Sequence, residues 1–64
     1  MQMNQLRIGD KLIWNVKEFD MVRPTIEPCV VVKINTEDDY AIAETSDGQG
    51  LYIDDDTIYQ FKKA

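Results

Sequence analysis

Residues 29–54, CVVVKINTEDDYAIAETSDGQGLYID, alternate strand-like runs with turn signals. Residues 29–35 are rich in β-branched side chains, and residues 40–45 and 50–54 place apolar side chains at every second position. Both patterns are typical of β-strands. Because Asp and Gly tolerate positive φ angles, the Asp47-Gly48 pair predicts a tight type I′ hairpin between the last two runs. This stretch therefore predicts three consecutive antiparallel strands.

The alternation also predicts which side chains share a face of each strand. It places Val30, Val32 and Ile34 on one side of their strand, opposite Cys29, Val31 and Lys33. The same period sets Tyr40 and Ile42 against Ala41 and Ala43, and sets Leu51 and Ile53 against Tyr52.

Weaker signals flank this stretch on both sides. Lys11–Val16 predicts a first strand with Leu12, Trp14 and Val16 on one face, after a bulge or turn at Gly9-Asp10. Residues 17–28 hold two prolines and no sustained period, which predicts a long loop or a flared hairpin. The aspartates at 54–56 predict a single 3₁₀ turn capped by Asp side chains, before a short strand at 58–61. Residues 1–5 and 62–64 are expected to be frayed.

This succession of elements resembles the SH3-like small β-barrel, including its bacterial SH3-like, KOW-like and Tudor-like forms. The opening LRIGDKL, residues 6–12, is similar to the first strand of many such domains. The resemblance covers roughly residues 6–61. It implies an all-β chain forming one five-stranded barrel domain over 1–64, with a long first loop and a short 3₁₀ turn before the last strand. An open five-stranded antiparallel sheet is the alternative.

Two positions of the chain differ from those of peptide-binding SH3 domains. Tyr40 begins the third strand where peptide-binding SH3 domains carry Trp, and Asp54, Asp55 and Asp56 stand near the 3₁₀ turn where those domains carry Pro and Tyr. Recognition of proline-rich peptides is therefore not expected.

Composition limits the chemistry that the chain can perform. Its 64 residues form one domain, with no histidine and a single cysteine. No nucleophile–base pair, ligand constellation or phosphate-binding glycine loop is apparent, so we expect no catalysis, no cofactor and no metal. The three consecutive aspartates suit a self-capping turn better than a Ca²⁺ or Mg²⁺ site. The polar N-terminus, the lack of an apolar span and the unpaired thiol lead us to expect a soluble, cytoplasmic protein.

Charge narrows the choice of partner. Twelve acidic residues oppose seven Lys and Arg, for a net charge of −5. We therefore expect a non-enzymatic acidic protein-interaction module whose partner has a basic surface, in a sharper form an inhibitor or adaptor of a nucleic-acid-processing protein. One alternative is a barrel that binds nucleic acid through scattered cations, namely Arg7, Lys11, Lys33, Lys62 and Lys63. Another is a structural subunit whose sheet edges pair in a homo-oligomer.

Two groups of residues are candidates for partner binding. Phe19, Met21 and Arg23 lie in the long loop, where they either contact a partner or fold back over the core. Tyr52 opposes an apolar strand face and is the best candidate for an exposed anchor. The aspartates at 54–56 belong to an acidic array whose other members are Glu37, Asp38, Asp39, Glu44 and Asp47, and which either mimics a phosphate backbone or only aids solubility.

Two further residues are expected to be structural. Cys29 has no histidine to activate it and precedes three valines, so we expect a small buried apolar side chain. Trp14 is expected to pack in the core, with its indole N–H directed to a polar rim.

Overall fold

The computed structural model describes residues 1–16 and 25–64, and the all-β prediction is confirmed. Within these residues, five strands and two 3₁₀ helices follow one another. They are η1 (Met3–Gln5), β1 (Lys11–Val16), β2 (Thr25–Asn35), β3 (Tyr40–Thr45), β4 (Gly50–Ile53), η2 (Ile58–Gln60) and β5 (Phe61–Lys63). The bounds predicted for β1 and β3 are confirmed, and so is a 3₁₀ turn before the last strand.

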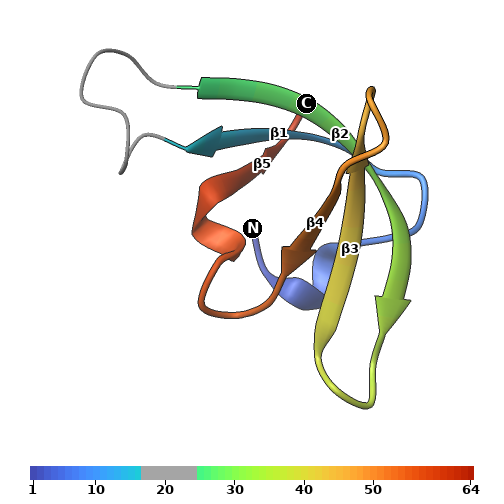
Figure 1. Ribbon diagram of the computed structural model, residues 1–64. Coiled ribbons are helices and arrows are strands. Elements are labelled where there is room, and N and C mark those ends of the chain that lie inside the picture. The colour runs from blue at the N-terminus through green and yellow to red at the C-terminus, as the bar shows by residue number, and fades with distance from the viewer. Residues whose placement is uncertain (17–24) are drawn as a thin grey trace.

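All five strands belong to one antiparallel sheet with the order β4-β3-β2-β1-β5. The long strand β2 lies at its centre, paired with β1 on one side and with β3 on the other (Figure 1). Among the described residues no pairing joins β4 to β5, so the sheet is open and these strands are its edges.

The core lies on one face of this curled sheet. Its most deeply buried large side chains are Leu12, Val31 and Ile53, one from each of three strands. Ala41 and Ala43, which pair with Ile53 and Val31, are also fully buried. The opposite side of the sheet is called the outer face below.

A β-bulge in β2 interrupts the predicted alternation. Val31 pairs with Ala43, but the next pair is Lys33 with Ile42, so Val32 has no partner in register. The extra residue reverses the faces that follow, and Ile34 packs against the core while Val32 is exposed. The prediction that Val32 and Ile34 share a face is therefore wrong, because a bulge places two residues opposite one.

The β3–β4 hairpin is present, but its turn differs from the predicted type I′. Among the non-glycine residues described, only Asp39 has positive φ, so Asp47 does not adopt the angle that type I′ requires. Gly48, at φ 88°, does. Gly48 N–H donates to the Thr45 carbonyl at 3.0 Å, and Thr45 N–H donates to the Gln49 carbonyl at 2.9 Å. This is a three-residue loop that ends in a left-handed glycine.

Part of the segment predicted as a long loop or flared hairpin is strand. Strand β2 begins at Thr25, so residues 25–28 are strand rather than loop. Pro28 is tolerated there because pairing with β3 starts only at Cys29, and one side of β2 therefore needs no N–H at position 28. The preceding residues 17–24 lie outside the described part of the chain.

Both terminal segments carry regular secondary structure. Met3–Gln5 forms a helical turn in which Gln2 N–H donates to the Gln5 side chain at 2.8 Å, and Met3 packs against the core. At the other end, the predicted strand 58–61 begins with η2, and the strand itself is Phe61–Lys63. Its pairing with β1 continues through the amide of Ala64, which donates to the Lys11 carbonyl at 2.9 Å. The expectation that residues 1–5 and 62–64 fray stays a prediction.

Candidate functional site

The residues predicted for partner binding fall into two groups. Phe19, Met21 and Arg23 lie outside the described residues. Tyr52 lies in β4, and Asp54, Asp55 and Asp56 form the turn that directly follows this strand.

Tyr52 is on the outer face with 52% of its surface exposed, as predicted for an anchor. Its ring stacks on that of Tyr40, with 5.1 Å between centroids. The Lys33 ammonium lies 5.8 Å from the centroid of Tyr40 on the neighbouring strand. Desolvation raises the pKa of the Tyr52 hydroxyl, and the nearby carboxylates of Asp54 and Asp38 raise it further. The phenol is therefore a neutral hydrogen-bonding group beside negative charge.

Asp54 is committed to its own turn. Its Oδ1 accepts hydrogen bonds from the Asp56 amide at 2.9 Å and from the Thr57 amide at 3.1 Å. The Thr57 hydroxyl closes the turn by accepting a hydrogen bond from the Asp54 amide at 2.9 Å. This is the self-capping arrangement expected for an Asp before a 3₁₀ segment. Asp55 and Asp56 are exposed.

Two of the acidic clusters meet at one end of the molecule. Asp39, from the β2–β3 turn, and Asp55, from the β4–η2 turn, line the same hollow of about 430 Å³. The N-terminal residues 1–4 and Ile58 form the rest of its wall. We call this region the acidic end and define it by six carboxylates: Glu37, Asp38, Asp39, Asp54, Asp55 and Asp56.

The predicted acidic array is therefore only partly assembled. Glu44 and Asp47 belong to the other end of β3, at the β3–β4 hairpin and away from the acidic end (Figure 1). Asp47 accepts a hydrogen bond from the Thr45 hydroxyl, which lowers the pKa of its carboxyl. Glu44 faces the outer side of the sheet beside Val30.

The sequence did not identify Tyr40 as a site residue. It was one of six aromatic residues that could supply an exposed face and was not chosen among them, yet it forms the stacked pair with Tyr52 and adjoins the β2–β3 turn. The signal that would have found it is the hairpin register, which pairs Ile42 with Tyr52 and leaves Tyr40 diagonal to Tyr52 on the same face.

Cys29 and Trp14, which were expected to be structural, both pack in or against the core. Cys29 is buried, and both desolvation and the charge of Glu27 raise the pKa of its thiol. A protonated, buried thiol is a poor nucleophile. The Trp14 indole stacks on Phe61 with 6.2 Å between centroids and donates its N–H to the Gln60 side chain at 3.0 Å.

Over residues 1–16 and 25–64, no group of three or more Cys, Asp or Glu side chains is placed to hold a metal ion. No helix in this described part of the chain is long and apolar enough to cross a membrane. No protein-family model, curated protein or solved structure matches the sequence or the fold at a significant level.

Proposed function

We propose that this chain is a non-enzymatic protein-interaction module that binds a basic partner through its acidic end and the Tyr40–Tyr52 pair. The observation that carries the proposal is the meeting of two acidic turns around one hollow, with Asp39 on one side and Asp55 on the other. The stacked tyrosines adjoin these turns and add rigid aromatic area, which proteins favour at the centre of interfaces.

The carboxylates of the acidic end are held on turns whose backbones are fixed by hydrogen bonds. In one turn, the Asp54 carboxylate holds the backbone of Asp55 and Asp56 by accepting a hydrogen bond from the Asp56 amide. In the other turn, the Asn35 side chain accepts a hydrogen bond from the Asp38 amide at 2.9 Å. Preorganised negative charge of this kind can occupy a cleft that normally holds nucleic-acid phosphates. This supports the sharper form of the proposal, in which the chain inhibits or adapts a nucleic-acid-processing protein. A reducing, cytoplasmic setting suits the lone buried thiol.

We also propose that the open sheet is a partly closed barrel of the SH3-like type. The strand order, the central strand β2 shared between two neighbours and the 3₁₀ turn before β5 support this assignment. The fold itself does not decide between partners.

One observation favours a second candidate, direct nucleic-acid binding. Pairing of β5 with β1 gathers Lys11, Lys62 and Lys63 along one edge of the sheet. Lys63 is already engaged, because its ammonium lies 3.4 Å from Asp10 and donates to the Gln5 carbonyl at 3.0 Å. This leaves Lys11 and Lys62 as a small basic patch, less extensive than the acidic end.

A pull-down with the tagged chain, with and without nuclease, tests the proposal. We expect a basic protein to be retained after nuclease treatment. Its capture should be lost in the double variant Asp55→Asn with Asp56→Asn. The matched control is Glu27→Gln with Asp47→Asn, which removes the same charge away from the acidic end and should retain the partner. Capture that disappears with nuclease, or that survives in the Asp55/Asp56 variant, would overturn the proposal.

A further inference from the structure

Strand β2 carries apolar side chains on its outer face as well as on its core face. Val30 and Val32 are 38% and 43% exposed, and Ile26 and Pro28 are exposed beside them. Ile13 of β1 lies opposite Pro28 in register. We call these five residues the outer stripe. An antiparallel sheet with one face in water normally alternates apolar and polar residues, so a second apolar face indicates that something covers it.

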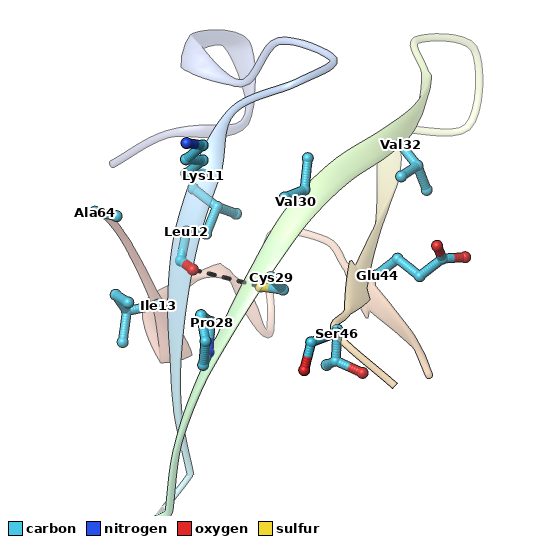
Figure 2. Close-up of a pocket in the computed structure, with 11 residues that line it drawn as sticks. Lys11, Leu12, Ile13, Pro28, Cys29, Val30, Val32, Glu44, Ser46 and Ala64 are labelled. Carbon is cyan, nitrogen blue, oxygen red and sulfur yellow. Dashed lines mark hydrogen bonds between the residues drawn. The ribbon is translucent and has the colours of Figure 1, made fainter. Parts of the chain in front are cut away.

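A groove of about 350 Å³ runs along this stripe between β1 and β3 (Figure 2). Val30 and Pro28 form its floor, while Lys11 stands on the β1 side and Glu44 on the β3 side. In register, Lys11 pairs with Val30, and Val30 pairs with Glu44. One row across the sheet therefore reads positive, apolar, negative.

The two charges of this row do not neutralise each other within the chain. Two strand spacings put their backbones roughly 10 Å apart. The one ion pair among the described residues joins Lys63 to Asp10 instead. The row thus offers an unpaired cation and an unpaired anion on opposite sides of an apolar centre.

We propose that a second copy of this chain covers the outer stripe, related by a two-fold axis that runs parallel to β2 above Val30. Such an axis exchanges the two sides of the sheet. It sets Lys11 of each copy opposite Glu44 of the other and brings the two Val30 side chains together. An axis perpendicular to the strands would instead oppose Lys11 with Lys11, so the charge pattern selects the first arrangement.

The dimensions of two packed sheets fit this arrangement. Sheets that pack face to face lie about 10 Å apart with their strands nearly aligned, a gap that a Lys and a Glu side chain span together. An interface of standard size takes about 800 Å² from each partner. That is about one sixth of the 4,662 Å² surface of the chain (800/4,662), an area that one face of the sheet can supply. The acidic end and its tyrosines are not required for this contact.

Sedimentation equilibrium of the full chain, with charge-reversal variants, tests the dimer. We expect a concentration-dependent dimer. Glu44→Lys should weaken it by about tenfold or more, because symmetry turns two attractions into two repulsions. The double variant Lys11→Glu with Glu44→Lys should restore the dissociation constant to within about threefold of the wild-type value, since the pairs are re-formed with exchanged signs. Glu37→Lys makes the same charge change away from the stripe and should leave the dimer intact.

A second variant probes the apolar centre. Val30→Glu places two carboxylates against each other on the axis and should weaken the dimer by at least about a hundredfold. Circular dichroism checks that this variant folds, and the charge-reversal pair remains decisive if it does not. A chain that stays monomeric to about millimolar concentration, a range in which even weak contacts are populated, overturns the proposal. So does a dimer that Glu44→Lys leaves unchanged, which would indicate pairing of sheet edges, or one that the double variant fails to restore.

Discussion

At the scale of single residues, two isoleucines differ in burial and should therefore differ in their contribution to stability. Ile53 has no exposed surface and belongs to the core, whereas Ile8 is 68% exposed. We expect Ile53→Ala to lower the free energy of unfolding by about 3 kcal/mol, because it removes buried methyl groups and leaves a cavity. Ile8→Ala should change it by less than about 0.5 kcal/mol. Urea denaturation measures both, and equal losses in the two variants would contradict the assigned core.

Thr45 is a buried polar residue whose hydroxyl organises the β3–β4 hairpin. The hydroxyl donates a hydrogen bond to the Asp47 carboxylate and accepts one from the Gln49 amide at 3.1 Å. Since the bond favours the ionised carboxylate, Thr45→Val should raise the pKa of Asp47 toward its ordinary value. Carboxyl NMR titration measures the change, with the exposed Thr36→Val as control.

The lowered pKa of Asp47 also determines how its contribution to folding stability changes with pH. The folded state holds this proton less tightly than the unfolded state, so the stabilisation is present above the ordinary carboxyl pKa and is lost as pH falls through the folded value. Thr45→Val should remove this part of the acid sensitivity. An Asp47 titration that is the same with and without the Thr45 hydroxyl would show that the hydrogen bond is not its cause.

At the scale of elements, the β3–β4 hairpin depends on one left-handed glycine. Gly48 has φ 88° with nothing within 4 Å of an added Cβ, so substitution there is limited by backbone strain and not by space. Gly48→Ala should therefore cost about 1 kcal/mol. Gly50 is the matched control, because its φ is not positive and an added Cβ would lie 3.7 Å from an Ile42 methyl carbon. Thermal unfolding should show a loss for Gly48→Ala and none for Gly50→Ala, and the reverse order would contradict the turn assignment.

Sequence patterns located the strands well wherever apolar alternation was bounded by turn residues. The bounds of β1 and β3 were predicted correctly for this reason. The start of β2 was not, because Pro28 argues against a strand unless one knows that β3 pairing begins one residue later. The bulge at Val32 was equally hidden, since consecutive valines fit either face of a strand.

The prediction of a type I′ turn was wrong, although the sequence contained the evidence for the three-residue loop. A two-residue Asp-Gly loop would pair Ser46 with Gln49 and place Ala43 opposite Tyr52, mixing the inner and outer faces. The observed pairing of Ala43 with Leu51 keeps both inside. Because a one-residue change of register moves every side chain to the other face, the alternation itself favoured the three-residue loop.

Over the whole molecule, charge is distributed unevenly. Asp39 and Asp55 line one hollow at the acidic end, while Lys11, Lys62 and Lys63 line the β1–β5 edge. The sequence predicted an exposed Tyr52 and acidic turns, but not which turns meet. That meeting follows from the β3–β4 register, which sets Ala41 opposite Ile53. The β2–β3 turn therefore lies beside residues 54–56, and Asp47 lies at the far end.

This segregation separates the two candidate functions within one experiment. A cationic partner should be drawn to the acidic end, and a nucleic acid to the β1–β5 edge. Both should weaken as salt rises, so the location of binding is more informative than its salt dependence.

The most direct test of the proposed function is therefore an amide NMR titration at near-physiological salt. A Lys- and Arg-rich peptide and a single-stranded oligonucleotide are added in parallel. We predict that the peptide shifts the amides of residues 37–39, 52 and 54–56, and that Tyr52→Ala weakens its binding. Peptide that leaves these amides unmoved, while the oligonucleotide shifts those of Lys11, Lys62 and Lys63, would contradict the proposal and favour direct nucleic-acid binding.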